Sequence, residues 1–232
     1  MDPIKYSIVI PCYNEEGAIE NTIDEVTEVM SPIQAYEIIV VNDGSTDATD
    51  KILSTLQNKH NHLRVINQEK NRGYGASLKT GIKHAKGEFI AITDADGSYP
   101  IDQPPNLLKA IPDYDMVVGA RITKDVVYPF IRKIPKFSLK RYPSWLSGVN
   151  IPDINSGLRV FRKKIYTKFM HVLPDGFSFT TTITMAMLTN GYRVKYLPIG
   201  YHARIGKSKI RPIRDTLNSL RMGLKYNVYF VI

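Results

Sequence analysis

The chain has 232 residues, enough to bury a substantial core, and it falls within the size range of one α/β domain. Its formal charge of +9 and pI of about 9.4 predict a surface that attracts nucleic acid, anionic lipid headgroups or a phosphorylated ligand. Nucleic acid is the weakest of the three, because the sequence has no paired Cys/His zinc pattern and no RNA-binding aromatic strand. We expect one domain, with a membrane surface or a phosphorylated partner.

Cysteine usage and the amino terminus indicate the compartment. The single cysteine, Cys12, excludes an internal disulfide, and MDPIKYSIVIPCYN lacks the basic region and apolar stretch of a secretory signal. We expect a cytoplasmic location. No run approaches the roughly 18 apolar residues that cross a bilayer, but the apolar ending Tyr226 to Ile232 leads us to expect that a natural protein could continue toward a membrane.

Short β-rich apolar runs alternate with longer segments of helical spacing over residues 1–120. This alternation predicts a mostly parallel central sheet flanked by crossover helices. The expected strands are Tyr6–Ile10, Ile38–Val41, Leu63–Ile66 and Phe89–Ile92. The expected helices are Gly17–Met30, a segment carrying Ile52, Leu53 and Leu56, and one that Gly73-Tyr74-Gly75 opens and Gly87 closes.

The pattern breaks from Lys124 to Val149, where a basic, aromatic and proline-containing stretch predicts a surface excursion with short helices. Regular structure is expected again beyond it, as the strand Leu158–Phe161, the helix Phe179–Leu188 and the strand Arg193–Leu197. The tail Arg211–Ile232 predicts an amphipathic helix with Ile213, Leu217, Leu220 and Leu224 on one face.

Polar residues follow three of the expected strands. Open parallel sheets bind ligands at the carboxyl ends of their strands. Asn14, Asp43 and Asp94 come after the first, second and fourth strands, so we expect them to lie near one another.

Asp94 and Asp96 are separated by one residue directly after an apolar strand. Two such carboxylates can bind a hard cation, Mg²⁺ or Mn²⁺, that takes its other ligands from water and substrate phosphates. A bare Asp-x-Asp is more often a polar turn, but its place in a βα series favours the metal. We therefore predict a phosphate-bridging metal site at this pair.

The turns after the first two strands carry candidate nucleoside ligands. Asp43 could accept a hydrogen bond from a nucleobase, whereas Asp47 fits the alternative role of helix cap better. Tyr13 suits contact with a base and Glu15 a ribose hydroxyl, although an acid at the start of a helix is also favoured by the helix dipole.

Three further features have competing interpretations. Cys12 is interpreted as a packed thiol, since no paired motif would activate a nucleophile. The glycines around Tyr74 indicate a tight helix entry and not a phosphate loop. The segment Arg204–Lys209 brings three cations around a glycine, which suits a loop that closes over a diphosphate; the alternative is a solvated basic loop.

Six motifs in order carry a resemblance that spans nearly the whole chain: SIVIPCYNEE, IIVVNDGSTD, NRGYGASLKTGIKHAKGEFIAITDAD, VVGAR, INSGLRVFRK and RIGKSK. Together they resemble the family 2 glycosyltransferases of GT-A fold, in particular the polyprenyl-phosphate glycosyltransferases. The resemblance implies metal-dependent transfer of a hexose from a nucleotide sugar. Residues 1–120 would then form the nucleotide-sugar-binding half and residues 121–232 the acceptor-side half.

The resemblance also implies roles for individual residues. The nucleoside would be held by Pro11, Tyr13, Glu15, Val41 and Asp43, and the metal and diphosphate by Asp94, Ala95 and Asp96. The phosphates of donor and acceptor would face Arg121, Arg132, Arg204 and Lys209, with Asp153 near the acceptor. Among these, Asp96, Asp153 and Arg132 would be the catalytic residues.

The donor would be UDP- or GDP-linked, and transfer would invert the anomeric carbon. A lipid phosphate, with a second pKa of about 6, is already largely ionised and needs no protein base, whereas a hydroxyl acceptor would need one, for which Asp153 is the candidate. The basic aromatic stretch Tyr128–Trp145 and the amphipathic tail favour a polyprenyl phosphate at the cytoplasmic face of a membrane. The alternatives are a saccharide or other hydroxyl acceptor, and a non-catalytic nucleotide-sugar or membrane-binding module.

Overall fold

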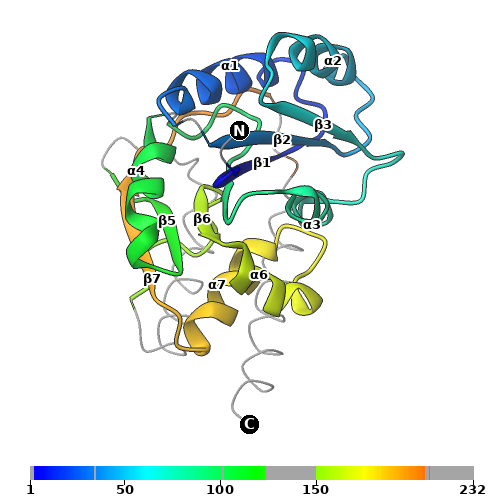
Figure 1. Ribbon diagram of the computed structural model, residues 1–232. Coiled ribbons are helices and arrows are strands. Elements are labelled where there is room, and N and C mark those ends of the chain that lie inside the picture. Colours follow the sequence, from blue (N-terminus) through cyan, green and yellow to red (C-terminus); the bar gives the residue numbers. More distant parts are fainter. Residues whose placement is uncertain (1–2, 34, 101, 124–149, 207–208, 210–232) are drawn as a thin grey trace.

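The computed structural model describes residues 3–33, 35–100, 102–123, 150–206 and 209. Within these ranges seven strands form one sheet in the order β3-β2-β1-β4-β6-β5-β7 (Figure 1). The strands are β1 (Tyr6–Cys12), β2 (Tyr36–Asn42), β3 (Leu63–Asn67), β4 (Phe89–Ile92), β5 (Met116–Arg121), β6 (Arg159–Arg162) and β7 (Val194–Ile199). The α-helices are α1 (Ile19–Met30), α2 (Thr49–Lys59), α3 (Tyr74–His84), α4 (Gln103–Ala110), α6 (Lys163–Phe169) and α7 (Phe179–Thr189). Two 3-10 turns, Ile111–Asp113 and Met170–Val172, extend α4 and α6.

One strand of the sheet runs against all the others. β6 pairs antiparallel with both β4 and β5, whereas β1 pairs parallel with β2 and β4, β2 with β3, and β5 with β7. The amino end of β6 therefore lies at the same edge as the carboxyl ends of the other strands. This reversal adds the residues that precede β6 to the loops that follow β1, β2 and β4.

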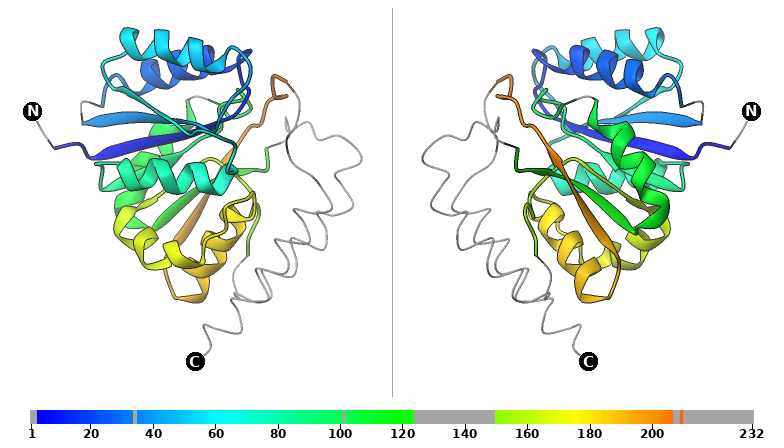
Figure 2. Two further views of the ribbon diagram at one scale, coloured as in Figure 1. Left: turned by 90° about the vertical axis from the view of Figure 1, so that its right-hand side faces the viewer. Right: turned by 90° about the vertical axis from the view of Figure 1, so that its left-hand side faces the viewer.

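Helices cover both faces of the sheet (Figure 2). Alternate residues of a strand point to opposite faces. In β1, Ile8 and Ile10 pack with α1, α2 and α4, and Val9 packs with α3, α6 and α7. Both cores are built mainly from fully buried aliphatic and aromatic side chains, as a parallel sheet covered on both faces requires.

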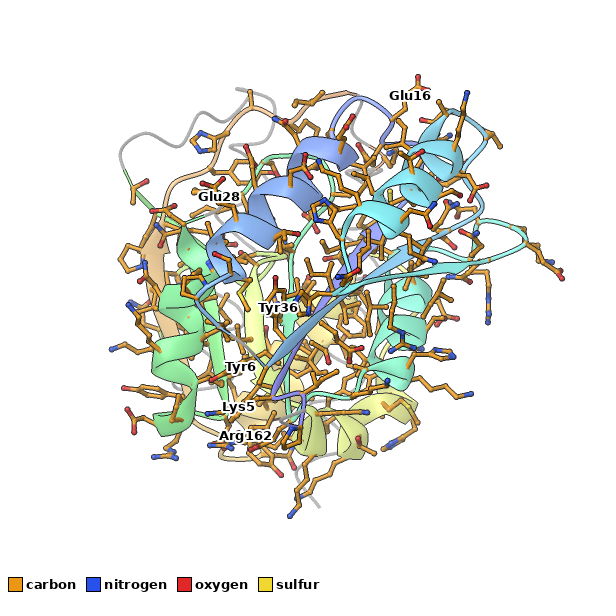
Figure 3. The ribbon with its side chains drawn as sticks, turned by 45° about the horizontal axis from the view of Figure 1, so that its top comes forward. Lys5, Tyr6, Glu16, Glu28, Tyr36 and Arg162 are labelled. Carbon is orange, nitrogen blue, oxygen red and sulfur yellow. The ribbon has the colours of Figure 1, made fainter. Side chains whose placement is uncertain are left out.

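Protein contacts occupy the amino edge of the sheet. Figure 3 shows Lys5, Tyr6 and Arg162 together, at the other end of β1 from Glu16. The Tyr6 ring stacks on Phe89 at 5.7 Å, and the Arg162 guanidinium lies 4.9 Å from the same Phe89 ring. The amino edge is therefore packed with protein side chains.

Each strand predicted over the described ranges is present, with ends within two residues of those expected. The three predicted helices of the first half and the helix at 179–188 are present as well. The sequence pattern did not single out α4, β5 or α6. The predicted excursion at 124–149 and the tail helix at 211–232 lie outside the described residues. In the part of the chain that is described, every helix is too short or too polar to cross a membrane.

The role predicted for Gly87 was wrong. The helix α3 ends at His84, and Ala85 is already extended, so Gly87 does not close it. A Cβ atom on Gly87 would lie 2.7 Å from the backbone nitrogen of Ser7. Glycine is needed there because the chain entering β4 passes directly against the start of β1.

Gly81→Ala tests how closely α3 packs on the sheet. An added Cβ would overlap Cγ1 of Val9 and lie 3.2 Å from Cγ2 of Val41. Overpacking costs about 1–3 kcal/mol, which exceeds the gain in helix propensity of about 1 kcal/mol. We expect a lower free energy of unfolding in urea, and a smaller loss when the same change is made in a Val9→Ala background. A stabilised single variant would contradict this packing.

Candidate active site

The loops after β1 and β2 are held together by side-chain hydrogen bonds. Asn14 adopts a left-handed backbone with φ of 53°, a conformation that asparagine tolerates. Its side-chain Oδ1 accepts the Thr46 N–H at 2.7 Å, and its own N–H donates to Ser45 Oγ at 3.0 Å. The turn that carries Tyr13 and Glu15 is thus fixed beside the end of β2.

Asp43 and Asp47 both accept hydrogen bonds from backbone N–H groups of the protein, and the N-cap position of α2 is Ala48 and not Asp47. Asp47 Oδ1 accepts the N–H of Thr49 at the start of α2, at 3.0 Å. The Asp43 carboxylate instead accepts the N–H groups of Arg72 at 2.8 Å and Gly73 at 2.9 Å. Burial raises the pKa of Asp43, although these N–H groups oppose the shift. Asp43 therefore ties the end of β2 to the entrance of α3.

The Asp94 carboxylate, beyond β4, lies close to Tyr74 and to Gly157. The Tyr74 hydroxyl donates to its Oδ1 at 3.1 Å. On another side, a Cβ atom on Gly157 would lie 2.8 Å from Oδ1 and 2.9 Å from Oδ2. Glycine at position 157 is therefore required to leave space for this carboxylate.

Asp96 has partners of a different kind. It is 4% exposed, and its Oδ1 accepts the N–H of Ser98 at 3.0 Å. Its Oδ2 lies 2.5 Å from Nη2 of Arg204 in an ion pair. Although burial opposes it, the Asp96 carboxylate raises the pKa of Arg204. The negative charge of Asp96 is thus compensated by the guanidinium of Arg204, which follows β7, the edge strand of the sheet.

Asp94 and Asp96 together fit a divalent cation. Burial, and then repulsion from Asp96, raise the pKa of Asp94 to about 7, and the two carboxylates together with Arg204 carry an excess of negative charge when both are ionised. No cluster of three or more His, Cys, Asp or Glu side chains suited to a metal occurs among the residues described. Two carboxylates suffice for a cation that completes its coordination with water and phosphate oxygens.

The segment after β7 returns to the carboxyl edge of the sheet, beside Asp96 and Ser98 (Figure 2). The N–H of His202 donates to the Ser98 carbonyl at 2.9 Å, and that of Ile205 to the Asp96 carbonyl at 3.1 Å. Further along, the Lys209 ammonium contacts the Glu15 carboxylate. Arg204 therefore lies beside Asp96 and Lys209 beside Glu15, at the carboxyl edge of the sheet; Lys207 and Ser208 are outside the described residues.

Arg121 and Asp153 had separate predicted roles, but the structure joins them. Arg121 Nε and Nη2 donate to the two carboxylate oxygens of Asp153 at 2.6 and 2.9 Å, and its backbone N–H donates to the same carboxylate at 3.1 Å. The guanidinium also lies 5.1 Å from the centre of the Tyr201 ring. Both oxygens of Asp153 are thus occupied by one arginine.

Three residues of the site were not predicted: Tyr74 and Gly157, described above, and Arg159. Arg159 is fully buried at the start of β6. It donates to the carbonyl groups of Ser156 and Thr180 and, at 3.0 Å, to the Thr184 hydroxyl. It thereby anchors the segment that carries Gly157 to α7. An arginine inside the apolar run Leu158–Phe161 was the one available signal.

The remaining predicted ligands are placed as follows. Pro11 and Val41 face each other as register partners of β1 and β2. The side chains of Val41 and Ala95 are buried in the two cores, so only their backbone can face a ligand. Cys12 is a packed thiol, as predicted, and burial raises its pKa. Arg132 lies outside the described residues.

Comparison with known proteins defines the class of this fold and site. The chain matches the crystal structure of glucosyl-3-phosphoglycerate synthase from Mycobacterium tuberculosis with Mn²⁺, uridine diphosphate and phosphoglyceric acid. The TM-score is 0.75 at 16% identity, over 96% of this chain and 78% of that one. The fold is the GT-A fold of glycosyltransferases. Residues 7–170 match glycosyl transferase family 2, and the chain belongs to this family.

Two curated relatives come from Haloferax volcanii. The low-salt glycan biosynthesis hexosyltransferase Agl6 is 29% identical over 224 residues, covering 94% of this chain and 52% of the relative. The dolichyl-phosphate hexose transferase is 30% identical over 208 residues, covering 89% and 86%. The chain therefore spans about half the length of the first and most of the second.

The pKa of Asp94 predicts how stability depends on pH in the metal-free protein. It is about 7 in the folded chain against an ordinary 3.8, so between these values the folded chain binds more protons than the unfolded one. The contribution of Asp94 to the free energy of unfolding should consequently fall as pH rises from about 4 to about 7. Asp94→Asn removes this titration and should flatten the fall. Urea unfolding across this range measures both curves; parallel curves would contradict the shift.

Proposed function

We propose that the chain transfers a hexose, with inversion, from a UDP- or GDP-linked donor to a polyprenyl phosphate. The observation that supports it best is the pair of half-buried Asp94 and buried Asp96 at the carboxyl edge, with Arg204 on the Asp96 carboxylate. Membership of glycosyl transferase family 2 and the name of the dolichyl-phosphate hexose transferase point in the same direction.

On the donor side, Tyr13 and Glu15 would bind the nucleoside, with the backbone of Pro11, Val41 and Ala95 beside it. Asp43, which keeps its bonds from the Arg72 and Gly73 N–H groups, would accept a nucleobase N–H on a remaining lone pair of its carboxylate. Asp94 and Asp96 would hold Mg²⁺ or Mn²⁺, which supplies positive charge against the departing diphosphate. Mn²⁺ accompanies uridine diphosphate in the Mycobacterium tuberculosis structure. Arg204 and Lys209 would exchange their carboxylate partners for donor phosphates when the donor binds.

On the acceptor side, the pairing of Asp153 favours a phosphate over a hydroxyl. A hydroxyl acceptor needs a base within hydrogen-bond reach of its proton, and both oxygens of Asp153 are taken by Arg121. A phosphate monoester with a second pKa of about 6 carries its charge at neutral pH and attacks without such a base. Asp153 would then act by holding Arg121 toward the acceptor phosphate, and Arg132 would be a further phosphate ligand.

A lipid acceptor would also determine where in the cell the protein acts. A polyprenyl phosphate resides in a membrane, so we propose that residues 121–232 form the acceptor-side half and meet the cytoplasmic face of a bilayer peripherally. The excess positive charge of the chain would favour anionic headgroups, at about 1 kcal/mol for each cation near the surface.

Asp96→Ala tests the metal-dependent step. Removal of a ligand that stabilises charge in the transition state should lower kcat by about 10²-fold or more, and EDTA should abolish the activity of the unchanged chain. Asp113→Ala, at an exposed aspartate, is the matched control. Radiolabelled hexose transferred from UDP and GDP donors into a lipid extract measures the rate. Full activity of Asp96→Ala in EDTA would refute the metal role.

The acceptor class can be tested directly with purified compounds. Detergent-solubilised polyprenyl phosphate should accept the hexose, whereas the corresponding polyprenol, which lacks the phosphate, should not. Mass spectrometry of the lipid product identifies the transfer. Product on free saccharides alone would reject the lipid phosphate and return Asp153 to the role of base.

A further inference from the structure

We infer that Tyr74 is a positioning residue, whose hydroxyl holds the Asp94 carboxylate in place to receive the donor's divalent cation. The inference rests on the proposed function and extends it to a residue outside the Asp-x-Asp pair. Three observations support it: the way in which Tyr74 is held, the difference between the partners of the two aspartates, and the close approach of Gly157 to the Asp94 carboxylate.

Tyr74 is held from three directions at the first residue of α3. Gly73, with φ of 103°, makes the turn before it and donates its N–H to Asp43. The Tyr74 ring stacks on Phe177 with the centres 5.4 Å apart and the planes 22° apart. A side chain on Gly75 would overlap the Pro174 carbonyl oxygen, so the helix start lies directly against the loop that precedes α7. These contacts fix the position of the Tyr74 ring.

The two aspartates differ in the charge of their partners. Asp94 receives a hydrogen bond from a neutral hydroxyl, whereas Asp96 is paired with the guanidinium of Arg204. A cationic partner competes with a metal for the carboxylate, and a neutral donor does not. Asp94 can therefore keep its Tyr74 bond when a cation arrives, whereas Asp96 must exchange Arg204 for it.

Gly157 restricts Asp94 further. The absence of a side chain on Gly157 leaves room for the carboxylate, since a Cβ atom there would approach both oxygens within 2.9 Å. A carboxylate confined in this way presents its oxygens in one orientation. Residues that orient a metal ligand through a hydrogen bond typically contribute about 10- to 100-fold in metal affinity.

Tyr74→Phe removes the hydroxyl and keeps the stacked ring. We expect it to weaken the binding of Mn²⁺ about 10-fold or more, measured by electron paramagnetic resonance of free Mn²⁺ with saturating UDP and, separately, GDP. The Mn²⁺ concentration needed for half-maximal transfer should rise by a similar factor. Tyr166→Phe is the matched control, because the buried Tyr166 hydroxyl has no hydrogen-bond partner within the described part of the chain. It should bind Mn²⁺ as the unchanged chain does.

A second variant separates positioning from general stability. Phe177→Leu retains the Tyr74 hydroxyl but removes the ring that stacks on it, so it should weaken Mn²⁺ binding by a smaller factor. Unchanged Mn²⁺ affinity of the folded fraction in Tyr74→Phe and Phe177→Leu would overturn the inference while leaving the proposed function intact. An unchanged chain that binds no Mn²⁺ with either nucleotide would overturn the proposed function, and the inference with it.

Discussion

The mutual repulsion of two carboxylates, half-buried Asp94 and buried Asp96, is the constraint around which the carboxyl edge is organised. One residue separates Asp94 from Asp96, and like charges that are close together and shielded from water disfavour ionisation of both. Three neighbouring elements accommodate the two carboxylates. The first residue of α3 donates a hydroxyl hydrogen bond to Asp94, and the segment before β6 leaves space for Asp94 with a glycine. The segment after β7 places an arginine against Asp96. The three contributions come from distant parts of the sequence, and the sheet order brings them together.

Much of the fold was predictable because a parallel sheet covered on both faces leaves a clear record in the sequence. Runs such as Ile38–Val41 are apolar at every position, and amphipathic segments such as Ile19–Met30 fill the intervals. The direction of a strand, parallel or antiparallel, is not evident from its residues in the same way. The apolar residues of β6 suit an antiparallel strand as well as a parallel one, so its reversal between β4 and β5 could not be foreseen.

Site residues could be predicted where their type indicates their chemistry, as for the aspartates and the basic residues. They could not be predicted where their role depends on which side chains the fold brings into contact. Asp94, Asp96, Arg204 and Lys209 were predicted to share one site, and the structure brings them to one edge. The pairing of Arg121 with Asp153 joins residues 32 positions apart. The contact of Tyr74 with Asp94, and the space that Gly157 leaves, depend on packing between helix, strand and loop. Residue spacing carries no signal for such contacts.

The reversed strand β6 also bears on the order in which the chain can assemble. Four strands, β3, β2, β1 and β4, pair among themselves, and all four have been synthesised once residue 92 has been added. The other side of β4 has no partner until Arg159–Arg162, which form β6, have been synthesised. During synthesis that side is an unpaired strand edge, of the kind that promotes association between chains. β5 likewise needs β6 and β7, both later in sequence, before either of its sides is covered. The strand that brings Gly157 to the carboxyl edge is thus also the one that joins two halves of the sheet, so Asp94 and Gly157 come together only after β6 has paired with β4.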